Sequence, residues 1–133
     1  LRFSCFRAQA DNEWATALEA AVAQPRFADP AAPGPFAFAD RDRVNNMLGA
    51  AGWDAITFES VDYAMVVGEG DQAVEEAFVY FQRIGPASRA LRELPPEARP
   101  AALDRLRATI AAHHDAGRVA LPAAAWIVTA RAP

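Results

Sequence analysis

The sequence has no lysine, one cysteine and no long apolar run. Without lysine, the chain cannot form a Schiff base with a carbonyl substrate. With Cys5 as its only cysteine, it can hold neither an internal disulfide nor a multi-cysteine zinc site. No apolar run approaches the roughly 20 residues of a membrane span, and no stretch reads as a signal peptide. We therefore expect a cytoplasmic protein with no membrane partner.

An excess of basic charge is also missing. The 13 basic residues, all arginines, face 17 acidic ones, which gives a net charge of −4. The arginines are scattered along the chain, whereas a nucleic-acid surface needs clustered basic charge. The hydrophobic fraction of 53% excludes a disordered chain, and 133 residues correspond to one domain, 1–133, with a core of its own. We predict a globular protein without a nucleic-acid partner.

Motifs that hold phosphates or nucleotides are absent too. Gly68 and Gly70 give only GxG after a predicted strand. Glu75 and Glu76 then open the next helix, where their charge suits the helix dipole and would repel a phosphate. No P-loop and no GxSxG nucleophile motif occurs in the sequence. We predict a turn at these glycines and no cofactor-binding residue in this chain.

Candidate catalytic and metal-binding side chains all have plainer explanations. His113 and His114 are adjacent, so on a helix they point about 100° apart and cannot easily clasp one metal ion. Cys5 lies within a predicted strand and is interpreted as a core thiol. Asp40 and Asp42 suit a helix start better than an acid–base pair. We expect no catalytic residue and no metal ligand in this chain.

Hydrophobic periodicity predicts a mixture of strands and helices. Alternation predicts strands at 1–7, 53–67 and 119–129, with a one-residue phase slip near Glu59 that is typical of a β-bulge. Helical spacing predicts a helix that Asp11 or Asn12 caps, with Leu18 and Val22 on its apolar stripe, and a helix that runs from Asp40 to a stop at Gly52. It also predicts helices through residues 71–116, with one apolar stripe at Ala77, Phe78 and Phe81 and another at Leu106 and Ile110. Pro122 must then lie at the start of the last strand or at a bulge, because proline donates no ladder hydrogen bond.

Three aromatic residues are candidates for binding a small molecule. Phe36 and Phe38 lie in a proline-stiffened loop, 26–39, where large apolar side chains are unusual. They either line a pocket or pack locally. Trp14 could join them, although it also belongs to the apolar stripe of its helix, which favours a core role.

The chain resembles the C-terminal third of class I S-adenosylmethionine-dependent methyltransferases, in the small-molecule branch related to ubiquinone and menaquinone biosynthesis. The resemblance spans LRFSCFRAQADNEW, GPFAFADRDRVNNMLGAAGWDAITFESVDYAMVVG and GRVALPAAAWIVTARAP. Its single matching positions are Arg7, Glu13, Trp14, Phe36, Asp40, the run Ala51–Gly52–Trp53 and the closing run from Trp126 to Arg131. These motifs are patterns of fold rather than catalytic signatures.

The resemblance implies an α/β fold, the C-terminal portion of a Rossmann-like methyltransferase fold. This chain would supply three strands of a mixed sheet, with strand 119–129 between strands 1–7 and 55–67 and antiparallel to both. Residues 71–116 would be a helical insertion before the last strand that caps the acceptor pocket. Phe36, Phe38 and Trp14 would contact the small-molecule acceptor. S-adenosylmethionine would bind only the full-length protein, to an N-terminal part upstream of Leu1, and this chain alone would be inactive.

A different class of function stays open. The chain could be a free-standing α+β binding or dimerisation module without catalysis. It opens without an initiator methionine, directly in an apolar strand, which favours the interpretation as part of a larger protein. The free edge of strand 1–7 needs a cover in either case, so we expect a homodimer contact or strand exchange there.

Overall fold

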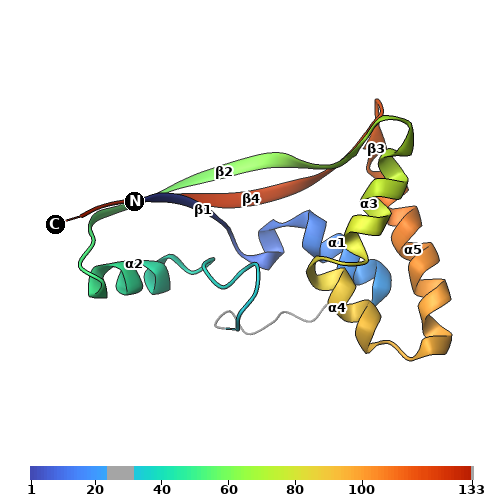
Figure 1. The fold of residues 1–133 in the computed structure, drawn as a ribbon, viewed down its shortest axis with the longest axis horizontal. Helices are drawn as coiled ribbons and strands as arrows, with labels where there is room; N and C mark the ends of the chain where they lie inside the picture. The colour runs from blue at the N-terminus through green and yellow to red at the C-terminus, as the bar shows by residue number, and fades with distance from the viewer. Residues whose placement is uncertain (24–31, 133) are drawn as a thin grey trace. The chain divides into compact units, whose positions relative to one another are not determined.

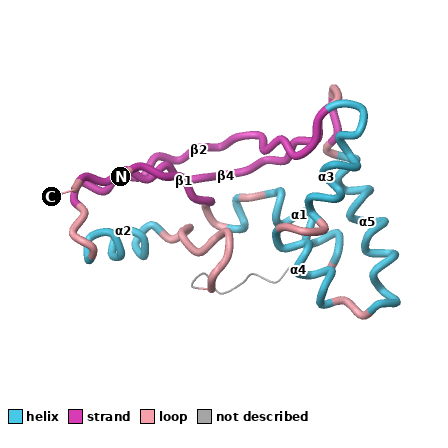
Figure 2. Tube along the Cα trace, viewed as in Figure 1, coloured by secondary structure: helices cyan, strands magenta, loops and turns pink. Residues whose placement is uncertain are grey.

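The computed structural model describes residues 1–23 and 32–132, and these form an α/β structure (Figure 1). The strands are β1 (Arg2–Phe6), β2 (Asp54–Glu69), β3 (His114–Asp115) and β4 (Arg118–Arg131). The helices are α1 (Glu13–Val22), α2 (Arg41–Ala50), α3 (Ala73–Phe81), α4 (Gly85–Glu93) and α5 (Arg99–Ala112). In chain order, α3, α4 and α5 come after β2 and before β3 and β4, and Figure 2 shows these three helices in cyan.

The long strands lie in the order β1-β4-β2, so the last strand of the chain is the central one. β1 runs antiparallel to β4, with Arg2 opposite Thr129 and Phe6 opposite Ala125. The arrows of β2 and β4 also run in opposite directions in Figure 1. The predicted order, with strand 119–129 between the other two and antiparallel to both, is confirmed.

The prediction of a mixed sheet is wrong, because the sheet is antiparallel. β1 and β2 run in the same direction, but β4 separates them, and no parallel pair of neighbours arises in the described sheet. The prediction also missed a strand. β3 pairs with the start of β4 through a tight turn in which Ala116 and Gly117 both have positive φ, 45° and 76°. The sequence predicts that residues 114–116 continue the last helix. In the structure they belong instead to a hairpin.

β2 carries the phase slip that the sequence predicts. Ile56 and Phe58 are its partly buried residues before the slip, and Val61, Met65 and Val67 are those after it. The less exposed side chains thus change from even to odd positions near Glu59. Because side chains alternate strictly along a regular strand, one extra residue is enough to produce this change.

Pro122 does not lie at the start of β4, because it comes four residues after the first residue of that strand. Two residues later, the N–H of Ala124 donates to the Asn12 side chain and the C=O of Ala124 accepts the N–H of Arg7. Both groups of Ala124 therefore face the β1 side. Backbone groups of residues two apart in a strand face the same way. The nitrogen of Pro122 therefore faces the β1 side at a position beyond the end of β1, where the ladder needs no donor.

The described residues divide into two compact units. Unit 1 comprises residues 1–12, 32–63 and 123–132, and unit 2 comprises residues 13–23 and 64–122. In unit 1, Val44 of α2 and Val128 of β4 are fully buried. α2 begins at Asp40, whose carboxylate accepts the N–H groups of Asp42 and Arg43, and ends near Gly52 at φ 85°, both as the sequence predicts.

Unit 2 is a helical unit around one apolar core. α1 contacts α4 and α5, and α3 contacts α4 and α5. Leu18, Phe81, Leu106 and Ile110 are each at most 1% exposed. The helices of the predicted insertion therefore share their core with α1, which precedes β2 in the chain. None of the helices within the described residues is long and apolar enough to cross a membrane.

Candidate functional site

The predicted pocket residues Phe36 and Phe38 pack on β1, in unit 1. The ring of Phe38 meets Phe3 edge to face, with 6.3 Å between centroids, and the ring of Phe36 lies 5.9 Å from Phe6. Phe36 is half-buried, whereas Phe38 is 39% exposed. Phe38 thus presents an aromatic surface to solvent. Of the predicted loop 26–39, residues 26–31 lie outside the described residues.

Hydrogen bonds to the sheet fix the backbone of this segment. The Cys5 thiol donates to the Phe38 carbonyl at 3.4 Å, and the indole N–H of Trp126 donates to the Ala39 carbonyl at 3.0 Å. Cys5 and Trp126 face each other across β1 and β4, so both side chains lie on one face of the sheet. Burial raises the pKa of the Cys5 thiol. The hydrogen bond of the thiol to the Phe38 carbonyl gives Cys5 a packing role between β1 and this segment.

Two guanidinium groups stack on the same tryptophan. Arg7 lies 5.4 Å and Arg41 lies 5.3 Å from the ring centroid of Trp126, and Arg41 also lies 5.1 Å from the ring of Phe58. Arg7 is neutralised by ion pairs with Asp11 at 3.3 Å and Asp62 at 2.8 Å. The cluster joins the strands to the start of α2 through cation–π contacts, which are worth about 0.5–1 kcal/mol each at exposed sites. It offers an aromatic and cationic surface but no acid–base pair.

Trp14 lies in the core of unit 2, not with the two phenylalanines of unit 1. It is 3% exposed and stacks on Phe81 with 6.5 Å between ring centroids. A Cβ on Gly85, whose φ is +86°, would lie 3.0 Å from the indole. This geometry gives Trp14 the core role that its helical stripe favours. Contact between Trp14 and a substrate stays a prediction.

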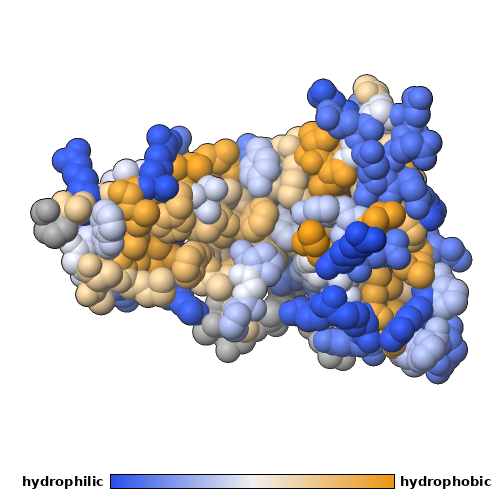
Figure 3. Space-filling model, viewed as in Figure 1, coloured by the Kyte–Doolittle hydropathy of each residue, from blue (hydrophilic) through white to orange (hydrophobic). Residues whose placement is uncertain are grey.

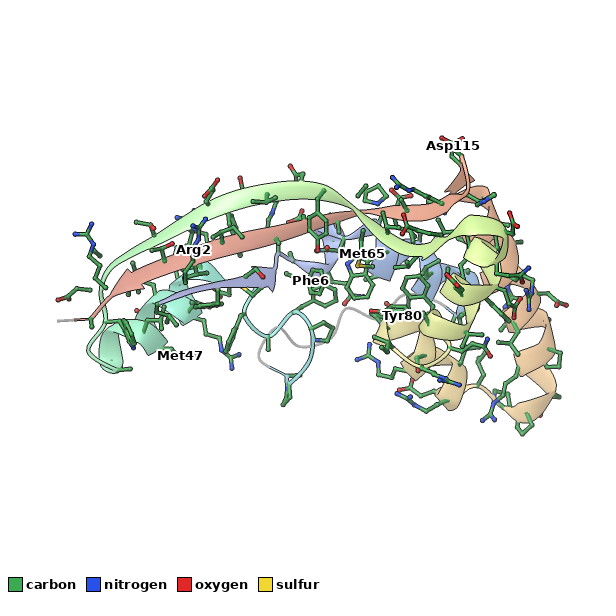
Figure 4. The ribbon with its side chains drawn as sticks, turned by 45° about the horizontal axis from the view of Figure 1, so that its top comes forward. Arg2, Phe6, Met47, Met65, Tyr80 and Asp115 are labelled. Atoms are coloured by element: carbon green, nitrogen blue, oxygen red, sulfur yellow. The ribbon has the colours of Figure 1, made fainter. Side chains whose placement is uncertain are left out.

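An apolar groove lies along the outer face of α3, in unit 2. One part, with a volume of about 520 Å³, is lined by Gln72, Glu75, Glu76, Val79, Tyr80, Arg83 and Ile84. A second part, of about 370 Å³, extends to the end of β2 and shares Glu76 and Tyr80. Figure 4 shows Tyr80 on α3 and Met65 on β2, which both line this second part. We call the two parts together the α3 groove.

The walls of the α3 groove are unusually exposed for large apolar side chains. Ile84 is 49% exposed, Val66 is 45%, and Val79 and Tyr80 are 39% each. Figure 3 shows hydrophilic residues over the helices with hydrophobic residues among them. The apolar stripe of Ala77, Phe78 and Phe81 predicts only the buried face of α3 and does not predict this exposed surface. The signal that could have revealed it was the second apolar set, Val79, Tyr80 and Ile84, between those positions.

Most charges beside the α3 groove are paired. Arg107 stacks on Phe78 and forms an ion pair with Glu75, and this hydrogen bond holds the pKa of Glu75 below its usual value. Arg118 pairs with Glu69 at 2.9 Å. Glu76 accepts the backbone N–H of Glu69 at 3.3 Å. Within the described part of the chain, neither Glu76 nor Arg83 has an oppositely charged side chain within 4.0 Å, so both keep an unneutralised charge.

The remaining candidates behave as structural residues. His113 donates to the Thr109 carbonyl at 2.8 Å and to the Glu13 carboxylate at 3.1 Å, which anchors the end of α5 to α1. Among the residues that the structure describes, no group of three or more histidine, cysteine, aspartate or glutamate side chains is placed to hold a metal ion.

The turn between β2 and α3 does not fit a nucleotide cofactor. A Cβ on Gly68 would lie 2.0 Å from the backbone oxygen of Ala73, so Gly68 allows close packing of the backbone within the chain. Glu75 and Glu76 stand in the first turn of α3 and make its N-terminus negative.

Comparison with known proteins gives no family. No protein-family model matches the chain, and no curated protein shows significant similarity to it. The resemblance to methyltransferases rests on the sequence patterns given above.

Proposed function

We propose that this chain is the C-terminal part of a class I S-adenosylmethionine-dependent methyltransferase acting on a small molecule. The observation that supports it is the strand order. Consecutive strands are neighbours roughly two-thirds of the time, yet β1 pairs with β4, the last strand, and not with β2. The resemblance predicts this order, with a reversed central strand. A Rossmann-like sheet completed by further strands is part of the proposal.

The residues present do not fit S-adenosylmethionine, because no glycine-rich turn links a strand to a helix. In the proposal, the cofactor, which supplies the transferable methyl group, is held by a part of the protein outside these 133 residues. The chain contributes an apolar wall for the methyl acceptor through Phe38 and Phe36. Transfer by displacement depends mostly on how the acceptor is positioned, and an aromatic wall on a fixed backbone serves that purpose.

Two observations test the proposal. Isothermal titration of residues 1–133 with S-adenosylmethionine should show no saturable binding. The reading frame directly upstream of Leu1 should encode a GxGxG segment, and the protein it encodes should bind the cofactor. Micromolar binding by residues 1–133 alone would contradict the proposal. A start codon directly before Leu1 would favour the alternative, a free-standing binding or dimerisation module.

A further inference from the structure

The α3 groove carries an inference that does not depend on the proposed methyltransferase function. Its exposed face has a symmetric arrangement along the helix. Val79 and Tyr80 form the apolar centre, Glu76 lies three residues before Val79, and Arg83 lies three residues after Tyr80. The backbone continues its helical path to this point, since the N–H groups of Arg83 and Ile84 both bond to the Tyr80 carbonyl. All four side chains thus follow one helical path and line the groove.

The two charges cannot neutralise each other within one chain. Seven residues correspond to two helical turns, or about 10.5 Å along the axis. Neither has another partner of opposite charge among the described residues, whereas the neighbouring Glu75 and Glu69 are paired with Arg107 and Arg118. The groove therefore presents an acid at one end, a base at the other and an apolar centre between them.

We propose that the outer face of α3 is a self-association surface, on which α3 of a second copy of this chain packs antiparallel across a two-fold axis between Val79 and Tyr80. This symmetry places Glu76 of each copy opposite Arg83 of the other and brings the two apolar centres together. A two-fold contact must be self-complementary, and an acid and a base at equal distances from the centre meet that condition.

The openness of the surface favours a helix over a small ligand as its occupant. Small-molecule sites bury about 70–90% of their ligand. The side chains of Val79, Tyr80 and Ile84 are 39–49% exposed, which is the geometry of an outer helix face. One helix pair gives a small interface, so we expect a dimer that dissociates at about 10–100 μM.

Charge reversal tests the pairing directly. Sedimentation equilibrium of residues 1–133 over about 5–500 μM should show reversible dimerisation of the wild type. Each single variant, Glu76→Arg or Arg83→Glu, creates two pairs of like charges across the two-fold axis. Each should weaken the dimer by about 10-fold. The double variant restores both pairs and should return to within about 3-fold of the wild type.

Controls keep the test independent of folding. Glu97→Arg reverses an exposed charge in unit 2 that does not line the groove, and it should leave dimerisation unchanged. Tyr80→Ser should weaken the dimer, and the far-ultraviolet circular dichroism of every variant should match the wild type. A monomeric wild type at the highest concentration would overturn the proposal. A dimer that tolerates both single reversals, or one that the double reversal fails to restore, would also overturn it.

Discussion

The buried Asn12 shows how one side chain can replace a length of strand. It is 0% exposed, and its Oδ1 accepts the N–H of Ala124 at 2.9 Å while its Nδ2 donates to the Ala8 carbonyl at 3.0 Å. β1 ends at Phe6, so the amide of Ala124 would otherwise lose a partner on that side of β4. The sequence predicts Asn12 or Asp11 only as a helix cap. The bridge to a residue 112 positions away is visible only in the fold.

We predict that Asn12→Ala destabilises the protein by about 1–3 kcal/mol, because it leaves the buried N–H of Ala124 without its acceptor. Urea unfolding followed by circular dichroism measures the free energy of unfolding. Asn45→Ala is the matched control, since Asn45 is exposed on α2, and it should change stability by less than about 0.5 kcal/mol. Equal losses in the two variants would contradict the role of Asn12.

His113 should make stability depend on pH. Partial burial lowers its pKa, but the hydrogen bonds to the Thr109 carbonyl and the Glu13 carboxylate outweigh burial, and the pKa lies above the ordinary 6.5. A pKa raised in the folded state stabilises the fold fully below the pKa of the unfolded chain. That stabilisation is lost as pH rises through the folded-state pKa.

We therefore expect wild type to lose more stability than His113→Gln between about pH 5 and pH 8 in urea unfolding. Glu13→Gln removes the charged partner and should reduce the same difference. A His113→Gln profile parallel to that of the wild type would contradict this prediction.

At the scale of elements, most helix and strand types follow from local pattern. The stripe of Leu18 and Val22 in α1 and that of Leu106 and Ile110 in α5 are buried as predicted. The predictions of secondary structure fail where a turn or the end of a neighbouring strand decides the geometry. The apolar pattern does not reveal β3, which has only two residues and depends on the turn at Ala116 and Gly117. Pro122 is tolerated inside β4 because β1 stops short of it, and the length of β1 relative to β4 is not a local property.

The junction of β2 and α3 gives the sharpest prediction at this scale. Gly68→Ala places a Cβ 2.0 Å from the Ala73 carbonyl oxygen, which is backbone and cannot rotate away. We expect a loss of at least about 1–3 kcal/mol in chemical unfolding. Gly49→Ala is the matched control in α2, where a Cβ meets nothing within 4 Å. It should stabilise the protein by about 0.5–1 kcal/mol, because alanine is the better helix former.

At the scale of the whole molecule, the proposed function depends on surfaces rather than on a catalytic group. Phe36 and Phe38 share one segment and both pack on β1, whereas Trp14 belongs to the core of unit 2. The prediction that the helices of 71–116 cap an acceptor pocket stays a prediction, as does a dimer contact through strand 1–7.

We predict that Phe36→Ala with Phe38→Ala, in the full-length protein, weakens acceptor binding and leaves S-adenosylmethionine binding within about 3-fold of the wild type. The double variant removes one exposed and one half-buried ring from the wall that contacts the acceptor. Full burial of a phenylalanine side chain is worth about 1.5–3 kcal/mol. Binding of both ligands is measured by isothermal titration. Equal loss of acceptor and cofactor affinity would mean that the two rings serve only the fold.

The sequence by itself determined the classes and approximate positions of the long elements, the Asp40 cap, the stop at Gly52 and the phase change in β2. These are local properties, set by periodicity, hydrogen-bonding side chains and backbone freedom within a few residues. The central place of β4 came from the family resemblance. Only the tertiary structure decided that Asn12 completes the edge of β4 and that α1 shares a core with α4 and α5. It also left Val79, Tyr80 and Ile84 exposed. Which surfaces meet depends on segments up to 129 residues apart, and no local pattern encodes that choice.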